Sequence, residues 1–522
     1  MNLLRREAAD ILAEIAALRA ADAPTHGGRV LSYVYDSGVA ELDELAAGAA
    51  RLMQPVNGLD PTTFTSVAAM EAGVVGFARR ILHGESDGSD GAEVVVGSVT
   101  SGGTESCMLA VKAARDVWRA ANRAGGAGDT RAPRLVAPTT AHAAFHKAAE
   151  YFGLRLDLVP VDPAGGAPEA AAVVDRLDDD VALVVLSAPS YPFAALDPIE
   201  EIAANCAERG IALHVDACIG GFALPFWPQR LRTWDLRLPG VTSLSADLHK
   251  YGYAPKGVSV LLTRGRDRQR HQYFATTGWP GYPVVNPTMA GSKPAGPLAA
   301  AWAIIHALGD SGFTELTGRS ARATSVLRRA IDGIDGLRIV GEPVGPLLAV
   351  AADEGVAQEL RVDPHHWADA LRTAGWQLQL QPGMVQADGT TLPPTTHLTV
   401  TPVTESVAGE LSGALVAAAD AVRGVPPVDG AVLVAELAAG LPGGPAALAA
   451  ASADLDSDAA ADLLAAFGLL GGHAGTVALP ARLAPVLALV ETLPAPLTER
   501  LLVELLARVV EPGGSQASRP SR

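Results

Sequence analysis

The chain has 522 residues, of which 49% are apolar and 19% are charged, so we expect a globular protein of roughly two to four domains. Its 40 Lys and Arg residues against 57 Asp and Glu residues leave a formal net charge of −17. Nucleic acids and anionic membranes are bound through basic patches, so this balance argues against both classes of partner.

The N-terminal segment and the cysteines favour a cytoplasmic protein. Residues 1–24 read as a charged amphipathic helix and lack the apolar centre of a signal peptide. No uninterrupted apolar run reaches the roughly eighteen residues of a membrane span. The three cysteines, Cys107, Cys206 and Cys218, form no CxxC pair and have no metal-ligand spacing with histidine. We therefore expect reduced thiols and a cytoplasmic location.

From about residue 90, short β-branched runs alternate with amphipathic stretches. The runs are "AEVVVGSV", "PRLVAP", "ALVVLSAP", "IALHVDA", "VTSLSA" and "GVSVLL". They are apolar throughout, which is typical of strands covered by helices on both faces. Intervening helices of about ten to fifteen residues predict right-handed βαβ units and an α/β domain with a parallel sheet.

Changes in this pattern divide the chain into four segments. They are a helical N-terminal segment (1–89), the large α/β domain (90–320), a smaller C-terminal α+β domain (321–424) and an Ala/Leu/Pro-rich helical extension (425–522). The small domain should contain strands at "LRIVGEP", "LLAVAA" and "HLTVTP". The extension is either structural padding, which we favour, or a helical cap that binds a partner, and its polar end is expected to be disordered.

The stretch "VTSGGTES", residues 99–106, follows a predicted strand and opens a helix. Adjacent glycines let backbone N–H groups approach an anion, and the helix N-terminus adds partial positive charge. Thr104 or Ser106 could cap the helix and donate a hydroxyl group to a phosphate, although capping alone would explain the pattern. The stretch has neither the Gly-Lys-Ser/Thr of a P-loop nor the spacing of a dinucleotide site.

Three ionisable side chains lie where predicted strands end. Asp216 ends "IALHVDA", where a carboxylate can keep a pyridinium nitrogen protonated or, alternatively, cap a helix. His142 follows "PRLVAP" and could stack on an aromatic cofactor or simply cap its helix. Lys250 follows "VTSLSA", and burial would lower the pKa of its ammonium group and make it a Schiff-base nucleophile, whereas the simpler alternative is a solvated turn lysine. Together with the glycine turn, these groups match what pyridoxal phosphate requires.

The longer stretches around these residues are distinctive in combination. They are "VTSGGTES", "AHAAFHKAAEYFGLRL", "LHVDACIGGF", "VTSLSADLHKYGYAPKG" and "NPTMAGSKPAG". Over about residues 28–402 the chain resembles the sphingosine-1-phosphate lyase branch of the pyridoxal-phosphate-dependent group II decarboxylase family. The resemblance implies the type I fold of pyridoxal-phosphate-dependent transferases, with a mixed, mainly parallel sheet. It also implies an obligate homodimer with shared active sites.

The resemblance further implies a reaction and roles for the strand-end residues. Lys250 would hold pyridoxal 5′-phosphate as a Schiff base, Asp216 would pair with its ring nitrogen, and His142 would stack on the ring. The reaction would be a retro-aldol cleavage of a phosphorylated sphingoid base, which yields a long-chain aldehyde and phosphoethanolamine.

The resemblance also implies a binding site for the cofactor phosphate. Gly103 and Thr104 would bind this phosphate, and His249 would lie nearby. Gly291 and Ser292 would complete the site from the neighbouring subunit.

At the substrate end, the resemblance assigns the substrate phosphate to Lys256 of "APKG", with Tyr35 of "VLSYVYDSG" reaching over from the other subunit. For Lys256 the alternative is a solvated turn lysine. Gly252 and Pro255 favour a turn that could bring Lys250 and Lys256 to one cleft.

Two residues depart from the family pattern. Asp60 stands where a histidine is usual near the substrate phosphate, which a carboxylate would repel, and Lys293 replaces an arginine. A second hypothesis is therefore an amino-acid decarboxylase on the same scaffold. A third, a catalytically silent scaffold, is disfavoured because Lys250, Asp216 and His142 are all present.

Overall fold

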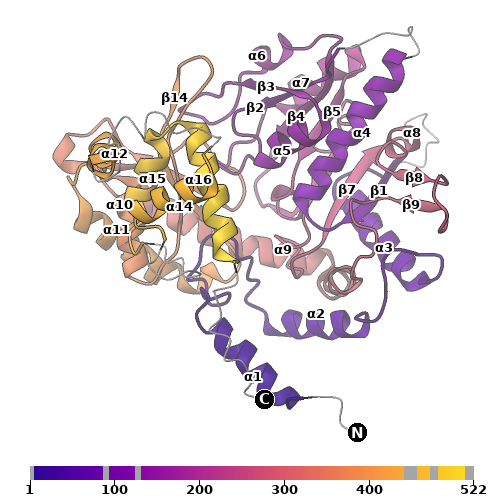
Figure 1. Cartoon of the computed structure of the whole chain (residues 1–522), viewed down its shortest axis with the longest axis horizontal. Coiled ribbons are helices and arrows are strands. Elements are labelled where there is room, and N and C mark those ends of the chain that lie inside the picture. The colour runs from indigo at the N-terminus through magenta and orange to yellow at the C-terminus, as the bar shows by residue number, and fades with distance from the viewer. Residues whose placement is uncertain (1–4, 86–92, 124–130, 440–454, 471–479, 512–522) are drawn as a thin grey trace. The chain divides into compact units, whose positions relative to one another are not determined.

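The structure, a computed structural model, describes residues 5–85, 93–123, 131–439, 455–470 and 480–511 (Figure 1). The chain divides into two compact units. The first consists of Met1–Leu327, Glu342–Leu348 and Leu398–Leu411, and the second of Arg328–Gly341, Ala349–His397 and Ser412–Arg522. The domain limits predicted from composition, at about residues 89, 320 and 424, remain predictions.

A seven-stranded sheet forms the centre of the first unit. Its strand order is β1-β7-β6-β5-β4-β2-β3, and neighbours are parallel except that β7 pairs antiparallel with β1 and β6. The strands are β1 (Val95–Thr100), β2 (Arg134–Pro138), β3 (Arg155–Val159), β4 (Val181–Ser187), β5 (Ala212–Asp216), β6 (Ser243–Ala246) and β7 (Ser259–Arg264). The predicted α/β fold with a mixed, mainly parallel sheet is thereby confirmed.

Apolar side chains cover both faces of this sheet. In β4, Leu183 and Val185 belong to the layer under α4 (Gly103–Arg123) and α5 (Ala143–Phe152), whereas Val184 and Leu186 belong to the opposite layer. All seven residues of β4 are buried. This double burial explains why the strand is an unbroken apolar run instead of an alternating one.

The sequence reasoning missed β3, which lies at one edge of the sheet. Only one of its five residues, Val159, is buried. Its charged residues Arg155 and Asp157 interrupt the apolar run, so β3 lacks the pattern that identified the central strands.

The first unit has further elements before, between and after the strands of this sheet. They are α1 (Ala8–Arg19), α2 (Ala40–Leu52), α3 (Thr65–Ile81), α6 (Ala170–Val174), α7 (Ile199–Arg209), α8 (Arg266–Gln269), the hairpin of β8 (Phe274–Thr276) and β9 (Val284–Asn286), and α9 (Gly296–Asp332), which continues into the second unit. The predicted helix at the N-terminus is α1, but none of its residues is buried.

A four-stranded sheet of order β10-β11-β15-β12 belongs mainly to the second unit. Its strands are β10 (Leu337–Ile339), β11 (Leu347–Ala352), β12 (Gln379–Gln381) and β15 (Thr395–Thr399), with a separate hairpin of β13 (Met384–Val385) and β14 (Thr391–Leu392). Strands were predicted at β10, β11 and β15. The polar strand β12 was missed because it has one apolar residue, Leu380.

The α-helices that the structure describes after β11 are α10 (Pro364–Thr373), α11 (Thr404–Val422), α12 (Gly430–Ala439), α14 (Ser457–Ala466), α15 (Ala484–Thr492) and α16 (Ala495–Val509). The last four share a small apolar core that includes Leu464, Leu489 and Leu497. The expected disorder at residues 513–522 lies outside the described residues.

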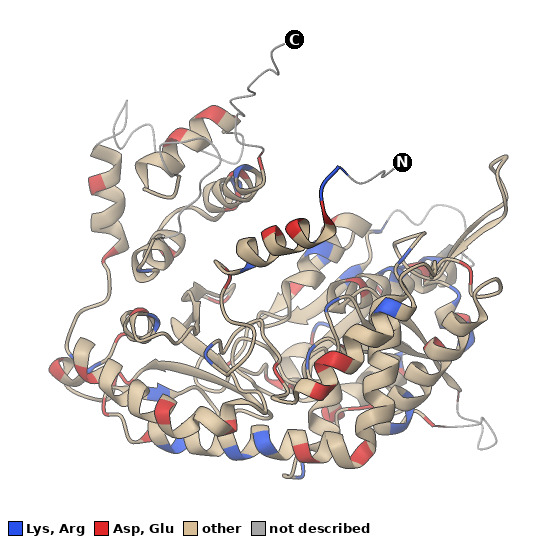
Figure 2. Cartoon of the chain, turned by 90° about the horizontal axis from the view of Figure 1, so that it is seen from below, with Lys and Arg blue, Asp and Glu red and all other residues tan. Residues whose placement is uncertain are grey.

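Charge is distributed in a mixed way over the described chain. Figure 2 shows Lys and Arg interspersed with Asp and Glu, often along the same helix. In the segments that the structure describes, no helix combines the length and the apolar character needed to cross a bilayer.

Candidate active site

The carboxyl ends of β1, β2, β5 and β6 meet at one edge of the seven-stranded sheet, because these strands run in the same direction. A predicted site residue lies at or just after each of these ends. These residues are Gly103, His142, Asp216 and Lys250. Parallel topology therefore gathers groups that are up to 147 positions apart along the chain.

Asp216 is a buried, ionised carboxylate. Its Oδ1 accepts a hydrogen bond from the N–H of Cys218 at 3.0 Å and lies 3.4 Å from the hydroxyl oxygen of Ser245. Burial raises the pKa of Asp216, but His142, the Cys218 donors and Lys250 outweigh it and hold the pKa below its usual value. The end of β5 therefore presents a negative charge at neutral pH.

His142 is exposed and caps α5. Its Nδ1 accepts a hydrogen bond from the N–H of Ala144 at 3.1 Å, so the capping alternative considered for this residue is present. The imidazole is nevertheless close enough to Asp216 to lower the pKa of that carboxyl. Capping leaves the ring face available for stacking, so the two interpretations are compatible.

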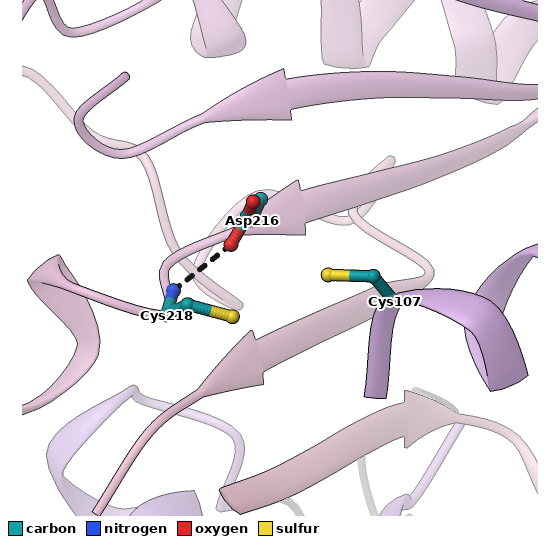
Figure 3. Close-up of side chains that lie close together, drawn as sticks. All are labelled: Cys107, Asp216 and Cys218. Carbon is teal, nitrogen blue, oxygen red and sulfur yellow. Dashed lines mark hydrogen bonds between the residues drawn. The ribbon is translucent and has the colours of Figure 1, made fainter. Parts of the chain in front are cut away.

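Two thiols lie beside Asp216. Figure 3 shows Cys107 projecting from α4 and Cys218 following β5, and the two sulfur atoms and a carboxylate oxygen lie within 4.8 Å of one another. The contact with Cys107 and burial raise the pKa of Cys218 well above its ordinary value. The contact with Cys218 lowers the pKa of Cys107, but burial reverses this and leaves that pKa raised. Both groups are therefore neutral thiols, and a soft metal ion here would have to share Asp216 with any cofactor.

Lys250 forms an ion pair that the sequence reasoning missed. Its Nζ lies 3.1 Å from Oδ2 of Asp247, whose side chain is 1% exposed. Burial lowers the pKa of Lys250, but the Asp247 carboxylate outweighs it and raises the pKa well above the usual value. The prediction that the pKa of Lys250 is lowered is thus wrong for the chain without cofactor. Asp247 could have been found as Asp216 was, as an acid at the end of a buried strand.

The glycine turn lies directly against this ion pair. A Cβ atom on Gly103 would lie 2.6 Å from Oδ2 of Asp247 and 2.8 Å from Sγ of Cys218, so only glycine fits. Thr104 is exposed in the first turn of α4. Ser106, the alternative phosphate donor, is buried, and its hydroxyl oxygen lies 2.7 Å and 2.9 Å from two other hydroxyl groups. The geometry favours Thr104 over Ser106.

His249 packs over the turn. Its Cε1 would lie 3.1 Å from a Cβ atom on Gly102, and its Nε2 lies 3.5 Å from Oδ2 of Asp247. Its Nδ1 accepts a hydrogen bond from the N–H of Val258 at 3.3 Å. Burial lowers the pKa of His249, which makes the ring neutral at neutral pH. His249 is therefore near the glycine turn, as the sequence predicted.

Lys256 lies on the far side of a tight turn from Lys250. Gly252 is required there, because a Cβ atom would lie 2.6 Å from the backbone of Leu248. The exposed Lys256 side chain turns back and donates a hydrogen bond from Nζ to the carbonyl oxygen of His249 at 3.0 Å. Partial desolvation and the Lys250 ammonium group lower the pKa of Lys256 to about 8. The predicted turn does bring the two lysines together.

Tyr35 lies in the same chain as both lysines. The Lys256 ammonium group is 4.5 Å from the centroid of the Tyr35 ring, and the ring packs edge-on against Tyr251 at 5.3 Å. Burial raises the pKa of Tyr35 to about 12, against the opposing charge of Lys250. Tyr35 thus contacts Lys256 within its own chain, and a contribution of Tyr35 from another subunit remains a prediction.

The loop with Gly291 and Ser292 is bonded to other residues of its own chain. Ser292 Oγ accepts a hydrogen bond from Asn57 at 3.1 Å, and Glu105 Oε1 accepts one from the N–H of Met289 at 2.6 Å. Among the hydrogen bonds of the described residues, none joins Gly291 or Ser292 to the glycine turn. Completion of a phosphate site by these residues, from a neighbouring subunit, remains a prediction.

A cavity of about 170 Å³ lies between this loop and the glycine turn. Its lining includes Ser101, Glu105, Lys256 and Lys293. The two lysines make it suitable for an anionic group, and the buried Glu105 is already engaged by the backbone N–H of Ser101.

Asp60 is fully exposed and caps its own turn. Its carboxylate accepts hydrogen bonds from the hydroxyl and N–H groups of Thr62 and Thr63 at 2.6–3.2 Å. The Thr62 and Thr63 hydroxyl groups, followed by the two N–H groups, lower the pKa of Asp60 to about 2. Asp60 therefore stabilises the turn before α3. The sequence analysis considered only its effect on the substrate phosphate, where the family usually has a histidine.

Comparison with protein families agrees with this geometry. The pyridoxal-dependent decarboxylase conserved domain matches residues 54–350. A second model, described as a C-terminal HTH domain of pyridoxal-dependent enzymes, matches residues 409–508.

Individual relatives are similar over most of the chain. A sphingosine-1-phosphate lyase from Dictyostelium discoideum is 37% identical over 66% of this chain and 63% of its own length. The structure of a sphingosine-1-phosphate lyase from Burkholderia pseudomallei has a TM-score of 0.72 and 32% identity over 81% of this chain and 93% of that chain. A glutamate decarboxylase from Lactobacillus brevis, with a TM-score of 0.69 and 21% identity over 82% of this chain and 95% of its own, shares the fold. The chain spans less than two-thirds of the length of the curated Dictyostelium relative.

Proposed function

The chain belongs to the family of pyridoxal-dependent decarboxylases, whose cofactor is pyridoxal phosphate, and on this premise we propose that it is a carbon–carbon lyase of phosphorylated sphingoid bases. The products would be a long-chain aldehyde and phosphoethanolamine. The similarity to sphingosine-1-phosphate lyases supports this substrate class. The observation that carries the proposal is the turn that brings both Lys250 and Lys256 close to Tyr35.

The residues at the sheet edge fit pyridoxal phosphate. An amine, an ionised carboxylate and an imidazole come together at Lys250, Asp216 and His142. The backbone at Gly103 approaches Asp247 so closely that a Cβ atom would occupy the space between them. This close approach lets the N-terminus of α4, with its unpaired N–H groups, lie next to the lysine.

Bound pyridoxal phosphate supplies an aldehyde that condenses with amines and a pyridinium ring that accepts electrons. Lys250 would hold the cofactor, and Asp216 would accept a hydrogen bond from its protonated ring nitrogen. Gly103, Thr104 and the N-terminus of α4 would bind its phosphate, with His249 close by. His142 would lie against its ring.

The substrate phosphate would bind at the other end of the Lys250–Lys256 turn. Lys256 would donate charge-assisted hydrogen bonds to it, and Tyr35 would donate its hydroxyl proton, which it retains at neutral pH because its pKa is about 12. Lys293, which lines the same cavity as Lys256, offers a second positive charge. These cations favour a phosphorylated headgroup over a neutral one.

We further propose a homodimer in which Gly291 and Ser292 serve the cofactor phosphate of the neighbouring subunit. In their own chain, Ser292 is exposed and bonded to Asn57. Because the Ser292 hydroxyl group is exposed, it could contact the cofactor phosphate of a neighbouring subunit.

The experiment is turnover by the purified protein, loaded with pyridoxal phosphate, of phosphorylated sphinganine and of a panel of amino acids. Aldehyde and carbon dioxide are both measured. Aldehyde from the phosphorylated base is expected, with no aldehyde from the same base without its phosphate. Carbon dioxide from an amino acid, without aldehyde from the base, would replace the lyase with an amino-acid decarboxylase.

A further inference from the structure

A chain of buried polar groups lies beside Asp216. His214 is two residues before Asp216 in β5, so both side chains project from the same face of the sheet. In β6, Ser243 is paired with His214, and Ser245 with Asp216. The His214 ring is completely buried next to Phe145 of α5. Its Nδ1 lies 2.9 Å from the hydroxyl oxygen of Ser243, and its Nε2 lies 3.1 Å from that of Ser245.

The protons of this chain of groups can be assigned by elimination. Burial lowers the pKa of His214 to about 4 against the opposing charge of Asp216, so the ring is neutral and has one N–H. Ser245 Oγ lies 3.4 Å from Oδ1 of Asp216, and an ionised carboxylate only accepts hydrogen bonds. The Ser245 proton is therefore directed to Asp216 and cannot also serve His214. With the Ser245 proton in this direction, a ring proton on Nε2 satisfies both nitrogen contacts, and Nδ1 then accepts from Ser243.

We propose that His214 is a positioning residue whose Nε2–H holds Ser245 as a hydrogen-bond donor to Asp216. Ser245 and the N–H of Cys218 both meet Oδ1, so together they fix the plane of the carboxylate and the direction of Oδ2 (Figure 3 shows the Cys218 bond). With the ring proton on Nδ1 instead, Ser245 would donate its proton to Nε2 of His214. A lone pair of Ser245 would then face the negative charge of Asp216.

The proposal deepens the proposed function and rests on the assignment of Asp216 to the ring nitrogen of pyridoxal phosphate. A buried carboxylate that loses a donor is less stable in its ionised form, so it pairs less well with a protonated nitrogen. His214 would thus affect cofactor affinity without touching the cofactor. The sequence offered a signal for this, because a histidine is unusual in the centre of an apolar strand.

The first test measures the Kd of pyridoxal phosphate for the full-length, cofactor-free protein by absorbance titration. Ser245→Ala and His214→Leu should each raise this Kd about tenfold, the effect of one hydrogen bond to a charged group. His214→Gln, whose amide can donate from a similar position, should recover most of the affinity. Thr242→Val is the matched control, because Thr242 directly precedes β6 and its hydroxyl group bonds only to the backbone of Leu213 in β5 among the described contacts. It should leave the Kd unchanged.

A double-mutant cycle separates positioning from general damage to the core. If His214 acts through Ser245, His214→Leu should change the Kd little when Ser245→Ala is already present. An equal change in both backgrounds would contradict the proposal. The Tm of each cofactor-free variant is measured as well, so that a weaker affinity for pyridoxal phosphate can be distinguished from a loss of folding stability.

A measurement on the cofactor-free wild type tests the proton assignment directly. Nitrogen NMR of protein with labelled histidines should show His214 at neutral pH as a neutral ring with a protonated Nε2 and an unprotonated Nδ1. A proton on Nδ1 would overturn the proposal, even in a protein that binds pyridoxal phosphate normally. Failure of the wild type to bind pyridoxal phosphate would instead contradict the proposed function, and the NMR result would still decide the role of His214.

Discussion

The two ends of the candidate site hold their side chains in different ways. At the cofactor end, Asp216 and Asp247 are buried, and each lies within about 3 Å of the donor that pairs with it. At the substrate end, Lys256 is exposed and contacts one carbonyl oxygen and one aromatic ring. Water can replace a lost partner at the exposed end but not at the buried end. Substitutions should therefore abolish function at the first end and modulate it at the second.

The strongest test of this contrast is Lys250→Ala. Wild-type protein loaded with cofactor should absorb near the visible edge, and borohydride reduction should fix the cofactor to Lys250. The variant should show neither the adduct nor turnover, because Lys250 is the amine next to Asp216. Mass spectrometry of the reduced protein locates the adduct. A wild-type protein that stays colourless with added pyridoxal phosphate would refute the assignment of the cofactor end.

Mixing impaired variants tests whether one chain supplies both ends. Tyr35 and Lys250 lie close together in one chain, so mixed dimers of Tyr35→Phe and Lys250→Ala should show no more activity than the two variants measured separately. Ser292→Ala mixed with Lys250→Ala should recover up to about a quarter of wild-type activity if Ser292 serves the neighbouring site. Subunit exchange is verified with differently tagged chains. Recovery with Tyr35→Phe would show that the tyrosine acts across subunits after all.

Lys256→Ala should weaken only the substrate end. A charge-assisted hydrogen bond to phosphate contributes about 1.5–3 kcal/mol, so kcat/KM for phosphorylated sphinganine should fall about ten- to a hundredfold. The cofactor absorbance should stay as in the wild type. An equal loss of bound cofactor would mean that the two ends are not separable.

The pH profile of kcat/KM tests whether the charge of Lys256 binds the substrate phosphate. Lys256 is positively charged below its pKa of about 8, so kcat/KM for the phosphorylated base should fall as the pH rises through about 8. Lys256→Arg retains its charge throughout this range and should lose that decline. The same decline in both proteins would assign it to another group.

Asp60→His should have the smallest effect. The carboxylate bonds to Thr62 and Thr63 and is fully exposed, so its replacement should not raise activity on the phosphorylated base, contrary to what the family pattern suggests. Asp60→Asn, which keeps an acceptor for these groups, is the control. A clear gain in kcat/KM with Asp60→His would show that the carboxylate opposes the substrate phosphate.

The amino-acid sequence by itself determined the architecture of the sheet and the residue types at its edge. Strands buried on both faces, such as β4, must be continuously apolar, and this local property can be recognised from the sequence alone. Strands β3 and β12 were missed because an edge or a polar environment removes that signal. Asp216, His142 and Lys250 were found because charged or polar residues at the ends of apolar strands are conspicuous.

Only the tertiary structure decided which groups meet and in what protonation state. The pKa of Lys250 depends on the distance to Asp247, and the sign of its shift changed once that carboxylate was placed 3.1 Å away. Tyr35 reaches Lys256 across more than 200 positions of sequence, so this contact could not be inferred from spacing. The sequence reveals residue types and periodicity, whereas Coulomb interactions and desolvation depend on distances that arise when the chain folds.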